Sequence, residues 1–342
     1  MKIALFAPDS KYPNIAIMKI SAWHKAQGDT VVFQPKSSKG IDKTYVSIIL
    51  TQSRKKARQI ASIFPNTDIG GTGWEITKEL PAEIEAMQPD YRLLTATDLY
   101  PMMRGAKTRE QKMLVAHDLT QAGIGFSSRG CINTVKSCPY CVVPLKEKQI
   151  KHVMSIRELM NPVSGSKLVY LLDNAFVSDP YFFEKMEEIR ELDLTVDIQS
   201  GIDLRRLDDE HAHALASIKH RGSLRMAWDN PVHEASVVCG IRTLRRHYKG
   251  DCTCYVLIGF NTSPEQDIMR VRKLHELGVR PYIMRYSSPF EEQEEKDTVS
   301  VRNDHFKRYV NGFVYKREPF ENYEPWVKQQ QDWGRQMSLK FA

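Results

Sequence analysis

The sequence predicts an α/β fold, and three observations carry that prediction. Short apolar runs typical of buried strands alternate along most of the chain with amphipathic segments that have helical spacing. Polar or glycine residues follow almost every apolar run, as they do in parallel sheets wound with helices. The length of 342 residues, with 27% charged and 42% hydrophobic residues, suits a globular protein of about two domains.

Residues 1–115 are predicted to form a Rossmann-like, doubly wound sheet. Strands are expected at 2–7, 30–33, 45–50 and 67–69, and helices at 14–26 and 80–91. Ligands of such sheets sit at the carboxyl ends of the strands. The glycine-rich turn Gly70–Gly73 lies at such an end, where it either lets the backbone approach a ligand or makes a tight turn. Residues 95–118, rich in polar and basic side chains, are expected to connect the domains.

Residues 116–290 are predicted to form a partial (β/α)6 TIM-type barrel. Strands are expected at 123–126, 168–172, 195–199, 223–227, 254–259 and 280–284. Helices are expected between them at 155–160, 180–191, 208–219, 231–247 and 264–277. The functional groups of such a barrel collect at the carboxyl ends of its strands.

Residues 291–342 are predicted to be a C-terminal helical extension. It opens with the acidic run Glu291–Glu295, expected to be a solvated helix face. Basic and aromatic residues then alternate from Arg302 to Arg317. This alternation favours a terminal helix that packs its rings on the barrel, and a nucleic-acid-binding surface is the alternative.

Three cysteines, Cys131, Cys138 and Cys141, lie close together in the sequence. Structural zinc and iron-sulfur clusters normally take four protein ligands, so three thiolates with no obvious fourth indicate a cluster with one open iron. The alternative is a structural zinc whose fourth ligand is Cys239, Cys252 or Cys254. Cys254 begins an apolar strand and Cys239 lies in an apolar helical stretch, where cysteine is usually a small core residue.

Composition disfavours a secreted or membrane-spanning protein. No apolar run approaches the roughly 20 residues that cross a bilayer, and the apolar run at the N-terminus is shorter than that of a signal peptide. The six cysteines do not resemble the disulfide framework of a small secreted domain. We therefore expect a cytoplasmic protein with no membrane association. The net charge of +7 leaves room for an acidic or nucleic-acid partner.

The segment 125–144 resembles the cluster-binding loop of the radical S-adenosylmethionine (radical SAM) superfamily, with Tyr140 directly before the last cysteine. Segments 170–176, 197–205, 226–230 and 255–265 are similar to the next strand ends of the group whose radical domain follows a cobalamin-binding-like domain. The resemblance covers most of residues 1–290. One departure is the spacing Cys-x6-Cys-x2-Cys, where the superfamily commonly has Cys-x3-Cys-x2-Cys.

The longer spacing is compatible with three converging ligands. Closing a flexible loop costs only about 0.6 kcal/mol more for each doubling of its length. The inserted stretch is polar enough to bulge into solvent, through Asn133, Thr134, Lys136 and Ser137.

The resemblance implies an enzyme that holds a [4Fe-4S] cluster on Cys131, Cys138 and Cys141 and binds S-adenosylmethionine at the open iron. An external one-electron donor such as flavodoxin or ferredoxin would drive reductive cleavage to a 5′-deoxyadenosyl radical. That radical would modify an unidentified substrate, a small molecule or a nucleic acid, by methylation or related C–H chemistry. A nonenzymatic, zinc-stabilised binding or scaffold protein is the alternative function.

The resemblance also implies contacts to S-adenosylmethionine. Asp173 and Asn174 would meet its amino group, and Gln199 and Arg205 its ribose or carboxylate. The remaining contacts would be to the adenine, from the side chain of Tyr140 and from the backbone at Ile258 and Gly259. Arg129 could offset the charge of the cluster, and Asp173 and Arg205 could instead form an ion pair at the barrel mouth.

Cobalamin is a separate question. Domains that supply a lower axial histidine carry Asp-x-His-x-x-Gly after the first strand, whereas here Pro8–Pro13 contains no histidine. A histidine-ligated cobalamin is therefore disfavoured. Because radical enzymes of this group can bind cobalamin without that ligand, and Gly70–Gly71 resembles the glycine pair near the nucleotide tail, cobalamin binding stays open. The rival is a degenerate domain that covers the barrel or docks substrate.

Overall fold

The computed structural model describes residues 1–103, 108–290 and 298–340. The chain divides into two compact units. Among the described residues, 1–199 and 288–290 belong to the first unit, and 200–287 and 298–340 belong to the second. The predicted domain boundaries near residues 115 and 290 stay predictions, and the acidic run Glu291–Glu295 lies outside the described residues.

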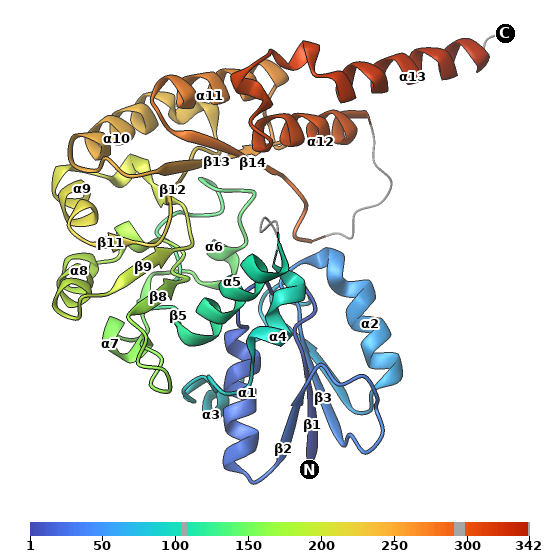
Figure 1. Ribbon diagram of the computed structural model, residues 1–342, viewed down its shortest axis with the longest axis vertical. Helices are drawn as coiled ribbons and strands as arrows, with labels where there is room; N and C mark the ends of the chain where they lie inside the picture. The colour runs from blue at the N-terminus through green and yellow to red at the C-terminus, as the bar shows by residue number, and fades with distance from the viewer. Residues whose placement is uncertain (104–107, 291–297, 341–342) are drawn as a thin grey trace. The chain divides into compact units, whose positions relative to one another are not determined.

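The first unit opens with a four-stranded parallel sheet in the order β2-β1-β3-β4. Its elements are β1 (Lys2–Phe6), α1 (Ile15–Ala26), β2 (Thr30–Phe33), β3 (Lys43–Ser47), α2 (Arg54–Ile63) and β4 (Thr67–Gly70). Side chains of β1 alternate between the two faces: Ile3 and Leu5 pack with Ile17 of α1, whereas Phe6 packs with Ala57 of α2. Helices α1 and α2 thus cover opposite faces of the sheet (Figure 1), as a doubly wound fold requires.

The helices of residues 1–121 differ from the predicted ones in extent and in number. The helix expected at 80–91 is only α3 (Ala82–Glu85), since Pro89 disfavours helical backbone in the residue before it. Helix α2 was not predicted, because Ala57 is its one buried residue and its basic surface hides the apolar stripe. The expected connection at 95–118 contains two helices, α4 (Ala96–Leu99) and α5 (Arg109–Gln121).

A second parallel sheet completes the first unit, with β8 between β5 and β9. Its strands and helices are β5 (Gly123–Gly125), α7 (Ile156–Leu159), β8 (Leu168–Leu171), α8 (Phe182–Glu191) and β9 (Thr195–Ile198). Two short strands, β6 (Ser128–Arg129) and β7 (Lys151–His152), pair antiparallel beside it, and α6 (Val143–Lys146) lies between them in the chain. The carboxyl ends of β5 and β8 lead directly to the cysteine segment and to Asp173.

The second unit contains a parallel sheet in the order β10-β12-β13-β14. Its strands are β10 (Ile202–Asp203), β12 (Leu224–Ala227), β13 (Cys252–Ile258) and β14 (Arg280–Arg285), and a further two-residue strand is β11 (Lys219–His220). Its helices are α9 (Asp209–Ala216), α10 (Glu234–His247), α11 (Pro264–Glu276), α12 (Thr298–Asn311) and α13 (Glu324–Lys340).

Aromatic rings fix the C-terminal helices of the second unit. Asn311 of α12 bonds the backbone of Ile283 in β14 through both atoms of its side-chain amide. Phe306, Tyr309 and Phe320 are buried and contact one another. These three rings therefore form a packed cluster, whereas Phe313 of the same segment is exposed.

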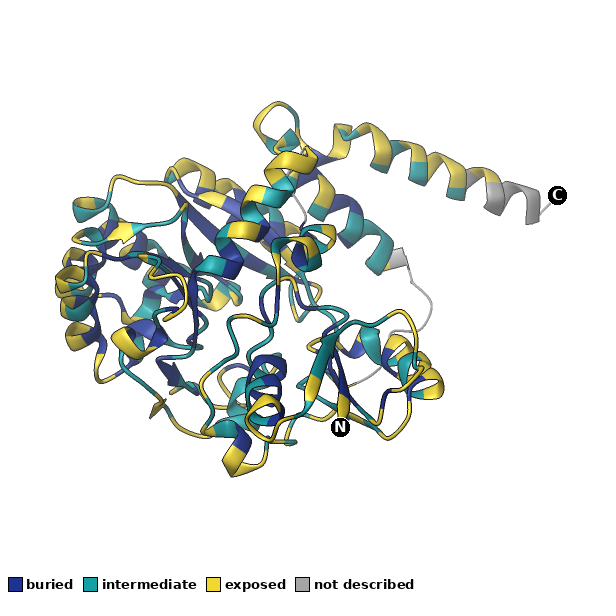
Figure 2. Ribbon diagram, turned by 60° about the horizontal axis from the view of Figure 1, so that its bottom comes forward, coloured by how far each residue is buried: buried dark blue, intermediate teal, exposed yellow. Residues whose placement is uncertain are grey.

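The predicted fold class is confirmed. All six strands expected after residue 115 are present in parallel sheets and are followed by helices, after a doubly wound N-terminal sheet. Figure 2 shows burial concentrated along the strands and exposure on the outer faces of the helices. No helix within the described ranges is long and apolar enough to cross a membrane.

Candidate functional site

The three cysteines lie on one loop that a short strand pair closes at its root. Ser128 and Arg129 of β6 pair with His152 and Lys151 of β7, so residues 130–150 leave and return at the same place. Gly130, with φ +93°, follows β6 directly. A Cβ at this position would lie 2.1 Å from the carbonyl oxygen of Gln149, so only glycine lets the two arms of the loop meet.

The inserted stretch forms an independent turn inside this loop. Ser137 and Cys138 donate their backbone N–H groups to the carbonyl of Thr134, at 3.1 and 2.9 Å. Thr134, Lys136 and Ser137 are exposed and Asn133 is half-buried. As the sequence predicted, most of the extra polar residues face solvent. The extra length is therefore taken up by a closed turn between the first two cysteines.

The cysteine side chains have few local partners. Cys138 is buried, and Cys131 and Cys141 are half-buried. The backbone N–H of Asn133 lies 3.4 Å from Cys131 Sγ, and the Tyr140 hydroxyl lies 3.8 Å from Cys138 Sγ. The backbone N–H of Cys141 donates to the carbonyl of Cys138 at 3.0 Å, which places these two residues on one turn.

The three cysteines match an iron-sulfur cluster in their number and in their position on one loop. Their thiol groups do not converge on a single point, as the ligands of one metal ion would. Within residues 1–103, 108–290 and 298–340, no three His, Cys, Asp or Glu side chains are grouped so that they could hold a metal ion. Each thiolate ligand of a [4Fe-4S] cluster binds its own iron, so such thiolates surround the cluster and do not converge on a single ion. Three cysteines outside any disulfide, on one loop whose inserted turn is exposed, match that demand.

The other cysteines differ in their surroundings. Cys252 and Cys254 are buried in β13, where burial raises the pKa of Cys252 to about 11 and raises the pKa of Cys254 well above its usual value. Both are core residues in the thiol form, as expected. Cys239 is exposed on α10 and is therefore not a core residue.

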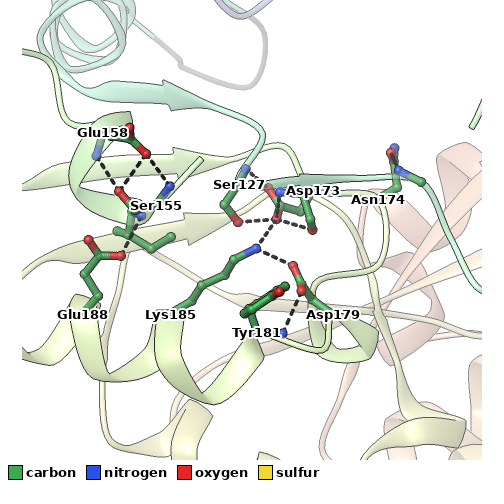
Figure 3. Close-up of polar contacts among 12 residues, drawn as sticks. Ser127, Ser155, Glu158, Asp173, Asn174, Asp179, Tyr181, Lys185 and Glu188 are labelled. Carbon is green, nitrogen blue, oxygen red and sulfur yellow. Dashed lines mark hydrogen bonds and ion pairs between the residues drawn. The ribbon is translucent and has the colours of Figure 1, made fainter. Parts of the chain in front are cut away.

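Asp173 and Asn174 follow β8 and bind the stretch that leads into the loop. Both carboxylate oxygens of Asp173 accept hydrogen bonds, from the backbone and hydroxyl groups of Ser127 and Ser128 (Figure 3). The side-chain oxygen of Asn174 accepts from the backbone N–H of Gly130 at 3.1 Å. Burial raises the pKa of Asp173, while Ser127, Lys185 and Ser128 oppose that rise.

Basic side chains flank the loop. Arg129 forms ion pairs with Glu147, at 2.7 Å, and with Glu85, at 3.6 Å. Lys146 Nζ lies 3.3 Å from the hydroxyl of Thr72, and burial together with the charge of Arg129 lowers the pKa of Lys146. A negatively charged group bound by the loop would therefore have two cationic side chains, Arg129 and Lys146, close to it along the chain.

Gln199, at the end of β9, has an unsatisfied donor. Its backbone N–H donates to the carbonyl of Leu171, which continues the sheet beyond β9. Its side-chain Nε2 is buried and has no hydrogen-bond partner in the described part of the chain. A buried amide donor without a partner is costly, so this atom suits a ligand acceptor.

The remaining predicted site residues belong to the second unit. Arg205 donates two hydrogen bonds to the carboxylate of Asp203, from Nε at 2.7 Å and Nη2 at 2.6 Å. The carbonyl of Ile258, at the end of β13, accepts from the backbone N–H of Tyr286. Gly259 follows with φ +76°, and a Cβ there would lie 3.0 Å from Asn303 Nδ2. The alternative ion pair of Asp173 with Arg205 stays a prediction.

The glycine turn at the edge of the N-terminal sheet is used for close packing. Gly71 has φ +91°, and a Cβ there would lie 2.3 Å from the carbonyl oxygen of Ile48. Asp9, directly after β1, accepts hydrogen bonds from the backbone N–H groups of Ile49 and Leu50. Residues 48–50 are thus held from both sides, which explains Gly71 and Gly73 without a ligand.

Several residues near the site were missed from sequence. Ser127 and Ser128 stand before the loop, and Lys185 and Asp179 form a buried ion pair behind Asp173. One signal was available for Lys185: it lies among the buried positions of α8, beside Met186, where an unpaired lysine is very rare. His233, which contacts Arg205, carried no comparable signal.

No protein-family model matches the sequence, and no curated protein matches it either. Among solved structures, the fold is similar to that of the radical S-adenosylmethionine methyltransferase TsrM from Kitasatospora setae, solved with cobalamin and a [4Fe-4S] cluster bound. That similarity has a TM-score of 0.56 and 13% identity, and it covers 83% of this chain and 72% of TsrM. It shows a shared fold.

A second solved structure, the tryptophan synthase A-subunit from Pyrococcus furiosus, aligns with a TM-score of 0.30. Its identity is 12%, over 91% of this chain and 97% of that one. At that score the alignment carries no argument about fold or function.

The contact between Arg205 and His233 predicts a pH effect on stability. Arg205 Nη1 lies 3.1 Å from His233 Nε2, and because a guanidinium only donates, this imidazole nitrogen must accept and the ring must be neutral. Burial and the charge of Arg205 lower the pKa of His233. The stabilisation from neutral His233 is present above the unfolded pKa of about 6.5 and is lost as pH falls through the folded pKa.

We therefore expect the free energy of unfolding to fall more between pH 7 and pH 5 in the wild type than in His233→Gln, which keeps an acceptor but cannot titrate. Urea denaturation across this range measures the difference. Equal pH slopes for the two proteins would show that folding does not lower the pKa of His233.

Proposed function

We propose that this chain is a radical SAM enzyme. One observation carries the proposal: three cysteines without a fourth lie on a single loop at the carboxyl end of β5, in a chain whose fold is similar to that of a radical SAM methyltransferase. The carboxyl ends of parallel strands are where β/α folds of this kind place their chemistry. The sequence resemblance of residues 125–144 supports the same reading.

Cys131, Cys138 and Cys141 are the proposed ligands of the cluster. If a cluster with one open iron is bound there, it would supply the electron for reductive cleavage of the C5′–S bond of S-adenosylmethionine, which yields methionine and a 5′-deoxyadenosyl radical. The protein holds the loop, keeps water from the radical and orients the substrate. Arg129 and Lys146 would offset the negative charge of the thiolate-bound cluster.

The contacts to S-adenosylmethionine remain proposals. Tyr140 and Gln199 are suited to it by position, since Tyr140 lies between two of the cysteines and Gln199 has an unpaired buried donor. Asn174 uses its side-chain oxygen to accept from Gly130, and its NH₂ has no hydrogen-bond partner within the described part of the chain. Arg205, Ile258 and Gly259 complete the proposed set. For Asp173, whose carboxylate is already engaged, a different role is argued below.

The proposed reaction is hydrogen abstraction from a carbon of a small molecule or a nucleic-acid component. Methylation would follow only if cobalamin also binds. The N-terminal sheet does not supply the histidine ligand, and its glycine turn packs against residues 48–50. These residues therefore do not favour a resident cobalamin.

The cobalamin question has a spectroscopic test. After incubation of the purified protein with cobalamin and reduction to Co(II), we expect either no uptake or an EPR spectrum without the splitting that a histidine nitrogen causes. The physical reason is the absence of a histidine after β1. A spectrum with nitrogen splitting from the protein would contradict this expectation.

The cluster ligands predict a clear difference between two cysteine variants. After anaerobic reconstitution with iron and sulfide, Cys138→Ala should lose nearly all 5′-deoxyadenosine formation from S-adenosylmethionine and dithionite. Cys252→Ala should largely keep it, because Cys252 lies in the core of β13 as a thiol. The measurements are iron and sulfide per chain and 5′-deoxyadenosine by chromatography.

Two outcomes would contradict the proposal. The reverse pattern between the variants would mean that the ligands are wrong. One tightly held zinc, with no iron uptake and no 5′-deoxyadenosine from the wild type, would favour the nonenzymatic scaffold.

We also propose that an acidic one-electron carrier, such as flavodoxin or ferredoxin, docks on the cysteine loop. Residues 129–151 contain five basic residues and one acidic residue, five minus one giving +4 of the chain's net +7. Exposed apolar side chains, Ile132, Val135 and Leu145, lie on the same loop. Apolar contacts with a charged surround are typical of transient interfaces, where complementary charge speeds association.

The docking proposal predicts that loss of basic residues on the loop slows cleavage driven by a protein electron donor and leaves cleavage driven by a chemical reductant unchanged. The triple variant Lys136→Glu, Lys148→Glu, Lys151→Glu should slow flavodoxin-driven cleavage of S-adenosylmethionine by about tenfold or more at low salt, because charge steering is lost. Cleavage driven by dithionite should be unchanged. The control replaces three exposed lysines elsewhere, Lys55, Lys56 and Lys219, with Glu. Equal losses in both triple variants would contradict this docking face.

A further inference from the structure

Asp173 and Asn174 bind three backbone N–H groups in the stretch that leads into Cys131. Ser127 N donates to Asp173 Oδ1 at 2.7 Å, and Ser128 N donates to Asp173 Oδ2 at 2.8 Å. Gly130 N donates to Asn174 Oδ1 at 3.1 Å. Two consecutive residues after β8 therefore bind most of the short segment that joins β5 to the cysteine loop.

The Asp173 carboxylate is built into the interior. It is 0% exposed, and the hydroxyl groups of Ser127 and Ser128 also donate to it. Behind it, Lys185 is buried, lies 3.9 Å from Asp173 Oδ2 and pairs with Asp179 (Figure 3). A buried charge persists only where it is paired and hydrogen-bonded, and Asp173 has both kinds of partner here.

The other side of the same segment is fixed as well. β6 pairs with β7, and Gly130 meets the backbone of Gln149. The residue before Cys131 is thus held by Asn174 through its N–H and by a close backbone approach at its Cα. The direction in which the chain enters the loop is set from two sides.

We propose that Asp173 and Asn174 are positioning residues. They fix the position and direction of the backbone where it enters the cysteine loop. This inference rests on the proposed function, because it assigns these residues to the geometry of the cluster ligands. Asp173 has its carboxylate oxygens engaged with Ser127 and Ser128, so it acts through the loop and does not touch S-adenosylmethionine. Asn174 contributes its oxygen to the loop and keeps its NH₂ for other contacts.

Hydrogen exchange in the cluster-free protein tests the anchor without any enzyme assay. In Asn174→Ala, amides of the peptide 125–132 should exchange about tenfold faster or more than in the wild type, because the Gly130 contact is lost. Asn174→Asp keeps the acceptor oxygen and should restore slow exchange. Asp173→Asn should have the same effect as Asn174→Ala over Ser127 and Ser128, provided that it folds.

Asn161 provides the matched control. It is also buried and bonds four backbone groups, the carbonyls of Thr120 and Gln121 at the end of α5 and the N–H groups of Val163 and Ser164, but these lie before the amino ends of β5 and β8. Asn161→Ala should lower the melting temperature without changing exchange in the peptide 125–132. After reconstitution, Asn174→Ala should also carry less iron per chain than Asn161→Ala, and Asn174→Asp should recover it.

The outcomes separate this inference from the proposed function. Unchanged exchange in Asn174→Ala, or an equal change in Asn161→Ala, would overturn the positioning role. So would normal iron content in a protein whose loop entry exchanges quickly. If the wild type takes up no iron at all, the proposed function fails, while the exchange data still report whether Asp173 and Asn174 hold the segment.

Discussion

The buried carboxylate of Asp173 is the contact on which the arrangement around the cysteines depends. An ionised side chain in the interior requires donors on every side, and here the donors come from the segment before the loop and from Lys185 of α8. The carboxylate joins β8 to the chain that leaves β5. Removing it would leave Lys185 with one buried partner and would free the backbone groups of Ser127 and Ser128.

This arrangement explains how a loop with little internal bonding can carry reactive groups. The backbone hydrogen bonds within the loop are confined to the turn at Thr134, the turn at Cys138 and the single turn of α6. Its root, in contrast, is bound on both sides by Asn174 and by the β6–β7 pair. A rigid root with an adaptable interior suits a site whose ligands must close around an inorganic group.

Much of the fold could be predicted because it follows from periodic patterns. The six strands after residue 115 are apolar runs followed by polar or glycine residues, and all six were found. Helix α2 was missed because the basic residues of its exposed face obscure an apolar stripe in which only Ala57 is buried, and α5 because its signal is a capping box at Thr108 with few buried positions. In α2 and α5 the spacing of hydrophobic residues is therefore a weaker signal of the helix than capping and helix-forming residues are.

The part of the candidate site that could be predicted from sequence is the set of cysteines, because this residue type by itself indicates metal-binding chemistry. The cysteines are visible in the sequence, whereas the partners of Asp173 come from separate segments and are joined only by the fold. The role of Gly71 could not be assigned either, since its close approach to Ile48 depends on how two strand ends meet. A residue whose role depends on contacts with distant segments cannot be recognised from its spacing to other residues in the sequence.

The separate turn from Thr134 to Ser137 has a consequence for recognising distant relatives. Because this turn is closed by its own hydrogen bonds and faces solvent, residues can be added or removed there while the loop root stays as it is. The number of residues between the first two cysteines is then free to drift during evolution. Searches that demand one fixed interval will overlook such chains, and a search based on the anchored root would recover them.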